Sequence, residues 1–171
     1  LIDQESNLRG LFFWGHAPNS QTRGLEMKKA MDKLDLLVVV DPFPSATAAM
    51  AAMTSKPEDL NANRAVYLLP ACTQFETSGS VTASNRSLQW REKVIEPLWE
   101  SRTDHIIMYQ RAEKLGFGKE LTKSHKLVAG KGGMMEPEPE SMLREINRSV
   151  WTIGYTGQSP ERLKAHMRNM N

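Results

Sequence analysis

Cysteine is nearly absent from this sequence, which contains Cys72 and no other. A single thiol cannot form an internal disulfide. The four histidines, His16, His105, His125 and His166, are scattered and show no zinc-ligand spacing with it or with one another. We therefore expect neither an internal disulfide nor a structural zinc site.

Long apolar runs and an excess of one charge are also missing. No run reaches the roughly 18 residues of a membrane-spanning helix, and no signal-peptide pattern opens the chain. The 22 basic and 20 acidic residues leave a net charge of +2, and no basic run alternates with aromatic residues, so nucleic-acid binding is not indicated. The chain begins at Leu1 without methionine and ends within an expected helix, so we expect a piece of a longer polypeptide.

The first half of the sequence alternates between strand and helix patterns. An apolar run at residues 8–14 predicts a strand that is covered on both faces. A second apolar run follows at 36–40, and between the two runs four apolar residues recur at helical spacing, namely Met27, Ala30, Met31 and Leu34. Strand, helix and strand within about 35 residues predict one right-handed βαβ unit.

Further elements of the same kind follow. An alanine-rich helix is expected to begin at Ser45, and residues 65–69 predict a third strand that ends at Pro70. This order predicts an α/β fold with three layers, in which a small, mostly parallel, Rossmann-like sheet has flanking helices and C-terminal helices follow. Residues 71–90 are rich in Ser, Thr, Asn and Gly, and we expect them to contain more loop than regular structure.

The second half is predicted to be mainly helical. A helix is expected at 103–115, with Thr103 as N-cap and Gly116 as its stop, and two more are expected at 141–150 and 159–170. We accordingly divide the chain into an α/β segment at residues 1–118, a flexible Gly- and Pro-rich connector at 119–140 and a helical segment at 141–171.

Two loops are candidates for ligand binding, because ligands of parallel sheets bind outside the carboxyl ends of the strands. The first runs from Gly15 to Gln21 and the second from Asp41 to Thr47. The first loop lacks the G-x-G-x-x-G fingerprint of dinucleotide-binding proteins. It fits either an ordinary turn between strand and helix or a phosphate site at the start of the helix.

The side chains of the second loop also have two interpretations each. Asp41 can bind a ribose diol or the paired N–H donors of guanine, or it can form the turn ahead of Pro42. Thr47 fits a first-turn hydroxyl or a phosphate ligand, and Phe43 fits a core contact or the wall of a base site. Cys72 fits a small buried residue better than a nucleophile, because no histidine is spaced to activate it.

Several segments together carry a family resemblance. They are "GLFFWGHAPNSQ", "LLVVVDPFPSATA", "YLLPACTQFETSGSVTASNRSLQW" and "SRTDHIIMYQRAEKLG". In this order they resemble the catalytic subunit of formate dehydrogenases in the molybdopterin oxidoreductase family, and the longer "MTSKPEDLNANR" segment is similar to the respiratory branch. The resemblance implies an interior segment that helps to hold a bis(molybdopterin guanine dinucleotide) cofactor.

The resemblance also implies roles for particular residues. The family's Gly-x-x-Pro loop corresponds to Gly15 through Pro18, its strand-end aspartate near guanine to Asp41, and its Leu-Pro, Glu and Gly markers to Leu69, Pro70, Glu76 and Gly79. Ala17 can offer only backbone groups, because many relatives have Asn or Asp there. The cofactor-binding residues implied are Gly15, His16, Ala17, Asn19, Gln21, Asp41, Phe43, Thr47 and Asp104.

The remaining implications concern the longer protein. The cofactor would carry molybdenum or tungsten, while a 4Fe-4S cluster and the metal-ligating selenocysteine or cysteine would lie outside these residues. Expected partners are the rest of the catalytic subunit, an iron–sulfur subunit and a membrane cytochrome subunit, at the periplasmic face of the bacterial inner membrane. Alone, the segment is expected to be inactive and to self-associate. The alternative is a free-standing, non-enzymatic α/β nucleotide-binding or interaction module.

Overall fold

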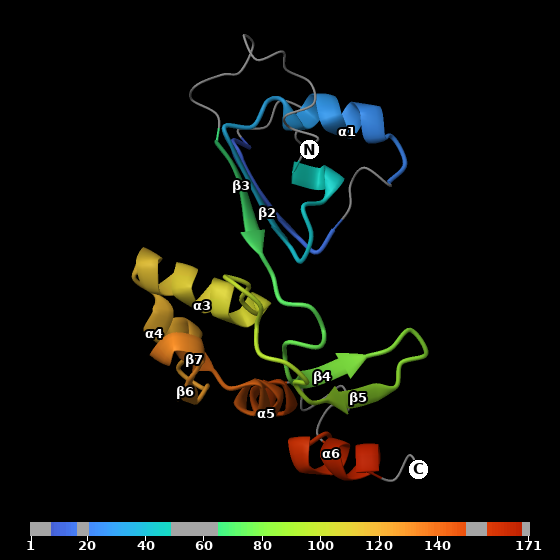
Figure 1. Cartoon of the computed structure of the whole chain (residues 1–171), viewed down its shortest axis with the longest axis vertical. Helices are drawn as coiled ribbons and strands as arrows, with labels where there is room; N and C mark the ends of the chain where they lie inside the picture. Colours follow the sequence, from blue (N-terminus) through green and yellow to red (C-terminus); the bar gives the residue numbers. More distant parts are fainter. Residues whose placement is uncertain (1–7, 17–20, 49–64, 150–156, 169–171) are drawn as a thin grey trace. The chain divides into compact units, whose positions relative to one another are not determined.

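The computed structural model describes residues 8–16, 21–48, 65–149 and 157–168. The chain divides into two compact units, Leu1–Ala71 and Cys72–Asn171, and each is considered by itself (Figure 1). The first unit contains a parallel sheet and the second contains two small antiparallel sheets with helices. The α/β class predicted from the sequence is therefore confirmed, whereas the division of the chain after residues 118 and 140 stays a prediction.

The first unit is built on three parallel strands. They are β1 (Gly10–Trp14), β2 (Leu36–Asp41) and β3 (Ala65–Pro70), in the spatial order β1-β2-β3. Gly10 lies opposite Leu36, and Leu36 lies opposite Ala65, so all three strands run in register from the same edge. The central strand β2 is apolar without alternation because both of its faces are covered.

Helix α1 (Gly24–Met31) covers one face of this sheet and forms the core with it. The core cluster joins Met31 and Leu34 to Leu37 and Val39, which are two residues apart on β2 and therefore point to the same face. All four of these side chains are at most 2% exposed. The predicted stripe thus faces the core, with Met27, Ala30 and Met31 on α1 and Leu34 just beyond its end.

The next predicted helix is described only at its start. Residues 46–48 are helical, and Ala48 packs against the core cluster. The continuation of the alanine-rich segment, at residues 49–64, lies outside the described residues.

The prediction that residues 71–90 are more loop than regular structure is confirmed for most of them, but it missed two short strands. The structure has an antiparallel hairpin there, formed by β4 (Gly79–Thr82) and β5 (Leu88–Arg91). Arg86 turns the chain with a φ of 67°, and Asn85 Oδ1 accepts hydrogen bonds from the amide and hydroxyl of Ser87. Both strands are four residues long, which is too short for a clear alternating pattern.

Helix α3 (Asp104–Leu115) confirms the predicted helix and ends at Gly116, which has a φ of 86°. Thr103 stands at the N-cap, but its hydroxyl lies 3.1 Å from the His105 ring instead of capping the backbone. Regular elements also occur between 118 and 137, mostly where the composition predicts a connector. They are α4 (Gly118–Leu121), β6 (Leu127–Ala129), η3 (Lys131–Gly133) and β7 (Met135–Pro137).

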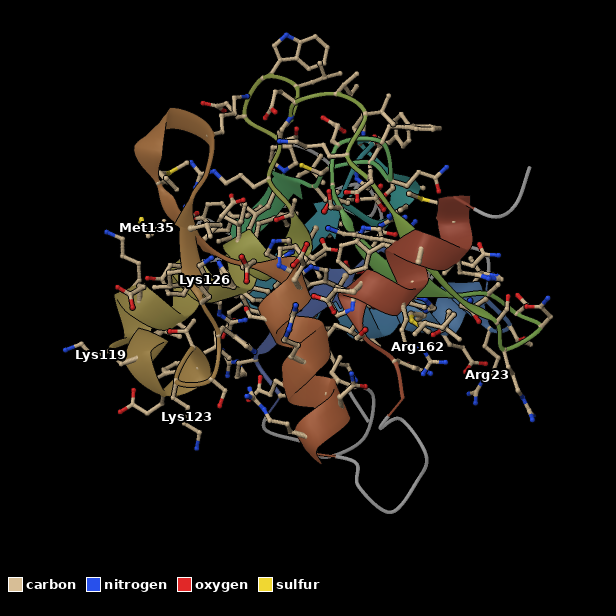
Figure 2. All side chains as sticks on the ribbon, turned by 90° about the horizontal axis from the view of Figure 1, so that it is seen from below. Arg23, Lys119, Lys123, Lys126, Met135 and Arg162 are labelled. Carbon is tan, nitrogen blue, oxygen red and sulfur yellow. The ribbon has the colours of Figure 1, made fainter. Side chains whose placement is uncertain are left out.

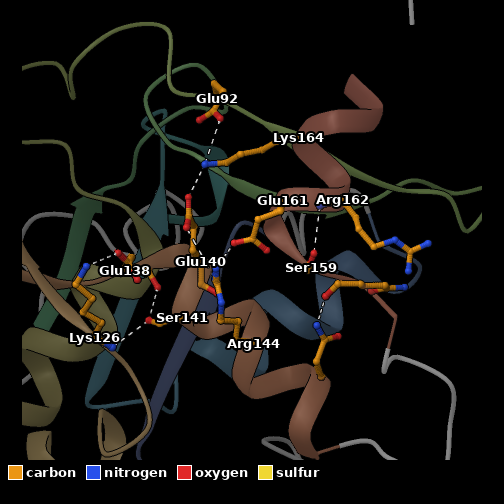
Figure 3. Close-up of polar contacts among 12 residues, drawn as sticks. Glu92, Lys126, Glu138, Glu140, Ser141, Arg144, Ser159, Glu161, Arg162 and Lys164 are labelled. Atoms are coloured by element: carbon orange, nitrogen blue, oxygen red, sulfur yellow. Dashed lines mark hydrogen bonds and ion pairs between the residues drawn. The ribbon is translucent and has the colours of Figure 1, made fainter. Parts of the chain in front are cut away.

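The second unit ends with the two predicted helices, α5 (Pro139–Ser149) and α6 (Pro160–Arg168). Helix α5 contacts β4, and α6 contacts β5. Polar contacts join these elements, and Figure 3 shows Lys164 of α6 between Glu92 and Glu140. In Figure 2, Lys119 and Lys123 instead point away from the ribbon of α4 and the turn that follows it.

Candidate functional site

The carboxyl ends of β1 and β2 place the two predicted ligand loops at the same edge of the sheet. Gly15, directly after β1, donates its amide proton to the carbonyl oxygen of Val40 at 2.9 Å. Its φ of 54° is left-handed, and a Cβ built there would have no neighbour within 4 Å. No described residue therefore crowds Gly15, and the glycine supplies a conformation that other residues rarely adopt.

The loop after β1 is linked to the loop after β2 by one side chain. Thr47 is fully buried, and its hydroxyl donates a 3.0 Å hydrogen bond to the carbonyl oxygen of His16. The His16 ring stacks on Phe13 with a centroid distance of 6.1 Å. Of the two interpretations of Thr47, the structure shows the hydroxyl in use as a link between loops.

Asp41, at the end of β2, has one carboxylate oxygen in a hydrogen bond and one without a partner among the described residues. Its Oδ1 accepts a 3.0 Å hydrogen bond from the amide of Phe43, which is a turn of the Asx type. In the part of the chain that the structure describes, Oδ2 has no protein partner. Asp41 is thus a turn former, and it still has the acceptor capacity that a pair of N–H donors requires.

Two further side chains of this loop point to a ligand rather than to packing. Phe43 is 69% exposed, so it is not a core contact. The hydroxyl oxygen of Ser45 is buried, and it has no hydrogen-bond partner among the residues that the structure describes. Buried hydroxyl groups are normally paired, and an unpaired one calls for an explanation such as a missing ligand or water. The sequence analysis did not single out Ser45, because nothing in the sequence distinguishes it from an ordinary first-turn serine.

The described structure does not test whether the other predicted site residues contribute to this edge. Ala17 and Asn19 lie outside the described residues, and Gln21 is exposed ahead of α1. Asp104 is the first residue of α3 and belongs to the second unit. Their roles as cofactor contacts stay predictions.

Glu76 has a structural role in the second unit. Its Oε2 accepts hydrogen bonds from the amide and hydroxyl of Thr73, and its Oε1 accepts one from the amide of Leu98 at 2.6 Å and lies 3.1 Å from the Ser101 hydroxyl. Burial opposes the ionisation of Glu76, but these hydrogen bonds outweigh it and lower its pKa to about 2. The carboxylate holds two loops together and is not available as an acid or base.

Cys72 is partly buried, as the sequence analysis expects. Burial raises the pKa of its thiol, and the thiol lies 3.8 Å from the Ser101 hydroxyl. A raised pKa leaves little thiolate near neutral pH, which argues against a nucleophilic role.

The second unit also contains a cavity of about 590 Å³ that the sequence analysis missed. Its walls come from residues 76–78, the segment 93–106 and the hairpin of β6 and β7. These segments are too far apart in the sequence for any local pattern to unite them. The residues that the structure describes contain no cluster of three metal-ligating side chains and no helix long and apolar enough to cross a membrane.

Comparisons with known proteins identify the family of this chain. Residues 2–114 match the molybdopterin oxidoreductase family. A formate dehydrogenase α subunit from Methanocaldococcus jannaschii is 32% identical over 120 residues, which are 69% of this chain and 16% of that protein. Formate dehydrogenase H from Escherichia coli is 28% identical over 111 residues, which are 64% of this chain and 14% of that protein.

Relatives named for a different activity match as well. A dimethyl sulfoxide/trimethylamine N-oxide reductase from Cereibacter sphaeroides is 34% identical over 100 residues, which are 57% of this chain and 10% of that protein. This chain thus spans less than a fifth of each of these relatives. Because the family match covers well over half of its residues, the chain belongs to the molybdopterin oxidoreductase family, whose members use a molybdopterin-type cofactor.

Proposed function

We propose that this chain is part of the catalytic subunit of a formate dehydrogenase, and that its sheet edge helps to hold a bis(molybdopterin guanine dinucleotide) with molybdenum or tungsten. The observation that carries this proposal is the state of Asp41, whose Oδ1 forms the turn while Oδ2 has no protein partner in the described structure. A carboxylate with spare acceptors at a strand end can accept the N1 and N2 protons of guanine.

The residues of this edge fit such a group. Among the described residues, the buried hydroxyl of Ser45 has no partner and nothing crowds Gly15, while Phe43 offers an exposed ring. An aromatic ring beside a carboxylate is a suitable setting for a planar base, since the ring can contact the face of the base while the carboxylate binds its edge.

The chain's own contribution is binding and orientation. Asp41 and Phe43 would hold the guanine end, and Thr47 would keep the loops after β1 and β2 in place through its bond to His16. When bound, the cofactor supplies the two-electron chemistry, with electrons passing to iron–sulfur clusters elsewhere in the protein.

The choice of formate as substrate rests on the sequence resemblance and on the formate dehydrogenases among the relatives. The dimethyl sulfoxide reductase relatives make reduction of an S- or N-oxide the competing activity. The test is to purify the intact protein that contains this chain and to assay formate-dependent reduction of an artificial acceptor beside oxide-dependent oxidation of a reduced viologen. Turnover with formate alone supports the proposal, and turnover with the oxides alone contradicts it.

The proposal extends to partners and location. An iron–sulfur subunit and a membrane cytochrome subunit at the periplasmic face of the inner membrane would accept the electrons, as in the respiratory enzymes that the sequence resembles. A free-standing, non-enzymatic nucleotide-binding module remains the alternative. Co-purification of the intact protein with a cytochrome-containing membrane fraction supports the first, and a protein without a pterin cofactor supports the second.

A further inference from the structure

The short turn after Asp41 has few hydrogen-bond donors. Residues 42–45 have the sequence Pro-Phe-Pro-Ser, and the two prolines have no N–H group. The amide of Phe43 donates to Asp41 Oδ1 at 3.0 Å, and the amide of Ser45 donates to the carbonyl oxygen of Phe43 at 2.7 Å. Both backbone donors of this turn are therefore in use.

The hydroxyl of Ser45 is the remaining donor of the turn. Its oxygen is buried and has no hydrogen-bond partner among the residues that the structure describes. Ser45 stands directly before the helical residues 46–48, where a serine hydroxyl normally accepts a hydrogen bond from an amide of the first turn. The amide of Ala48 instead donates to the carbonyl oxygen of Ser45 at 3.1 Å. In the described structure, the hydroxyl thus contributes neither to the turn nor to the start of the helix.

A second hydroxyl of the same loop has a structural partner. Thr47 is fully buried, and its hydroxyl donates to the carbonyl oxygen of His16 at 3.0 Å. Buried hydroxyl groups are normally paired in this way. Of the two hydroxyls, that of Thr47 links the loops, whereas that of Ser45 is free to bind a ligand.

A guanine that is bound through Asp41 requires one donor beside this carboxylate. The edge of guanine carries N–H groups at N1 and N2 and a carbonyl oxygen, O6, next to N1. A carboxylate accepts the two protons, but it has no proton to offer O6. Leaving O6 without a donor weakens binding, because the oxygen loses its hydrogen bond to water and gains none in return.

We propose that the hydroxyl of Ser45 donates to O6 of the guanine, so that Asp41 and Ser45 together select this base. The inference rests on the proposed cofactor site and adds to it a residue that determines which base is bound. Ser45 as a residue is half-buried, and rotation about its Cα–Cβ bond moves the hydroxyl between staggered positions. Adenine lacks both the O6 acceptor and the proton on N1, so it fits neither side chain as guanine does.

The test compares two nucleotides that differ in one atom. In 6-thioguanosine monophosphate, a sulfur atom replaces O6, and sulfur is a weak hydrogen-bond acceptor. Each nucleotide is titrated calorimetrically into the intact protein that contains this chain, prepared from a host that makes no pterin cofactor. The pH is mildly acidic, so that both bases are uncharged. We expect the wild type to bind GMP more tightly than the thio analogue by about threefold to tenfold.

Variants separate the two side chains. Ser45→Ala should weaken GMP by about threefold to tenfold and the thio analogue by less than about twofold, so the preference is lost. Ser45→Thr keeps the hydroxyl and should keep the preference. Asp41→Asn should weaken both nucleotides together, because both have the protons on N1 and N2. Ser87→Ala, in the turn between β4 and β5, is the matched control and should change neither affinity.

Stability distinguishes binding of a ligand from a role in the fold. Because the hydroxyl of Ser45 has no partner in the described structure, Ser45→Ala should leave the unfolding temperature of the unliganded protein unchanged or higher. A lower unfolding temperature would show that the hydroxyl stabilises the fold, and it would contradict the inference.

The titrations also distinguish this inference from the proposed function. If Ser45→Ala keeps the wild-type preference for GMP while Asp41→Asn weakens both nucleotides, the guanine site stands and Ser45 is not its O6 donor. If Asp41→Asn weakens neither nucleotide, or if the intact protein binds no GMP, the proposed cofactor site is itself wrong and the inference fails with it.

Discussion

The hydroxyl of Thr47 donates a hydrogen bond of 3.0 Å to the carbonyl oxygen of His16, across 31 residues of sequence. Thr47 is fully buried, so neither partner can be replaced there by water without rearrangement. The bond fixes the separation of the loops that follow β1 and β2. The geometry of the proposed cofactor edge therefore depends on one buried hydroxyl.

Replacing Thr47 with valine tests this link. Valine keeps the shape but leaves the His16 carbonyl oxygen without its donor, so the free energy of unfolding should fall by about 1–3 kcal/mol. Urea unfolding of the 171-residue chain measures the change. Thr47→Ser keeps the hydroxyl and should recover part of the loss. Equal stability of Thr47→Val and the wild type would show that the hydrogen bond contributes nothing.

Glu76 should be the most sensitive carboxylate of the second unit. In Glu76→Gln, an NH₂ group replaces one carboxylate oxygen and faces the donors that bind this oxygen in the wild type. The expected loss of unfolding free energy is about 2–3 kcal/mol. Glu120→Gln is the matched control, because Glu120 is exposed on α4 and has no hydrogen-bond or ion-pair partner in the described structure. A Glu76→Gln protein as stable as this control would contradict the structural role.

The same residue predicts a pH dependence. The pKa of Glu76 is lowered from its ordinary value of 4.5 to about 2 in the folded chain. Its stabilising contribution is therefore fully present above about pH 4.5 and is lost as the pH falls towards 2. The stability difference between wild type and Glu76→Gln should accordingly shrink between these two pH values, and a difference that stays constant over this range would contradict the lowered pKa.

Much of the first unit could be predicted from the sequence because its elements are long and periodic. The apolar run of β2 and the helical stripe of α1 are both local patterns, and they become the core cluster around Met31 and Leu37. The hairpin of β4 and β5 could not be predicted in this way. It is stabilised by contacts from α5 and α6, which lie far along the chain.

The residues of the candidate sites also differ in whether a local sequence pattern could predict them. The position of Asp41 at a strand end could be predicted, since it follows directly from the apolar run before it. The unpaired hydroxyl of Ser45 could not, because burial depends on tertiary packing. The cavity beside Trp99 depends on Lys131 and Glu136, more than 30 residues away, and no local pattern connects them.

Lys164 is predicted to hold α6 against the rest of its unit. It pairs with Glu140, lies 3.6 Å from Glu92, and its Nζ lies 5.0 Å from the centre of the Trp90 ring (Figure 3). Lys164→Met keeps the apolar stem and removes the charge. We expect a local loss of about 1 kcal/mol, seen as roughly fivefold faster amide hydrogen exchange in α6.

Lys119→Met is the control for this change, because Lys119 points outward from α4 (Figure 2) and has no ion-pair partner in the described residues. High salt should reduce the difference between Lys164→Met and the wild type, since the ion pairs are partly exposed. Unchanged exchange in α6 would mean that the apolar contacts alone hold this helix.

Cys72 should react slowly with thiol reagents. Burial raises the pKa of its thiol, so less thiolate is present at pH 8 than for a free cysteine. Alkylation by iodoacetamide should be slower than that of free cysteine by about tenfold or more, and urea should remove the difference. Reaction at the rate of free cysteine in the folded chain would disprove the burial of this side chain.

The last prediction separates the turn that Asp41 forms from the guanine binding proposed for it. Asp41→Asn keeps Oδ1 as the acceptor for the Phe43 amide, so the turn should persist, but it replaces Oδ2 with an NH₂ group that faces the donors of a guanine. Loss of a charge-assisted pair should cost about 1.5–3 kcal/mol. This corresponds to roughly tenfold to hundredfold weaker binding of guanine nucleotides, with adenine nucleotides little affected.

The measurements are the pterin and GMP content of the intact protein carrying Asp41→Asn, beside calorimetric titration with GMP and AMP. Asp41→Ala is the matched variant, because it removes the turn acceptor and the guanine acceptor together and should lower both stability and nucleotide content. Asp41→Asn should lower nucleotide content alone. If Asp41→Asn retains full cofactor content and unchanged GMP affinity, the carboxylate serves the turn and the guanine end of the cofactor is held elsewhere.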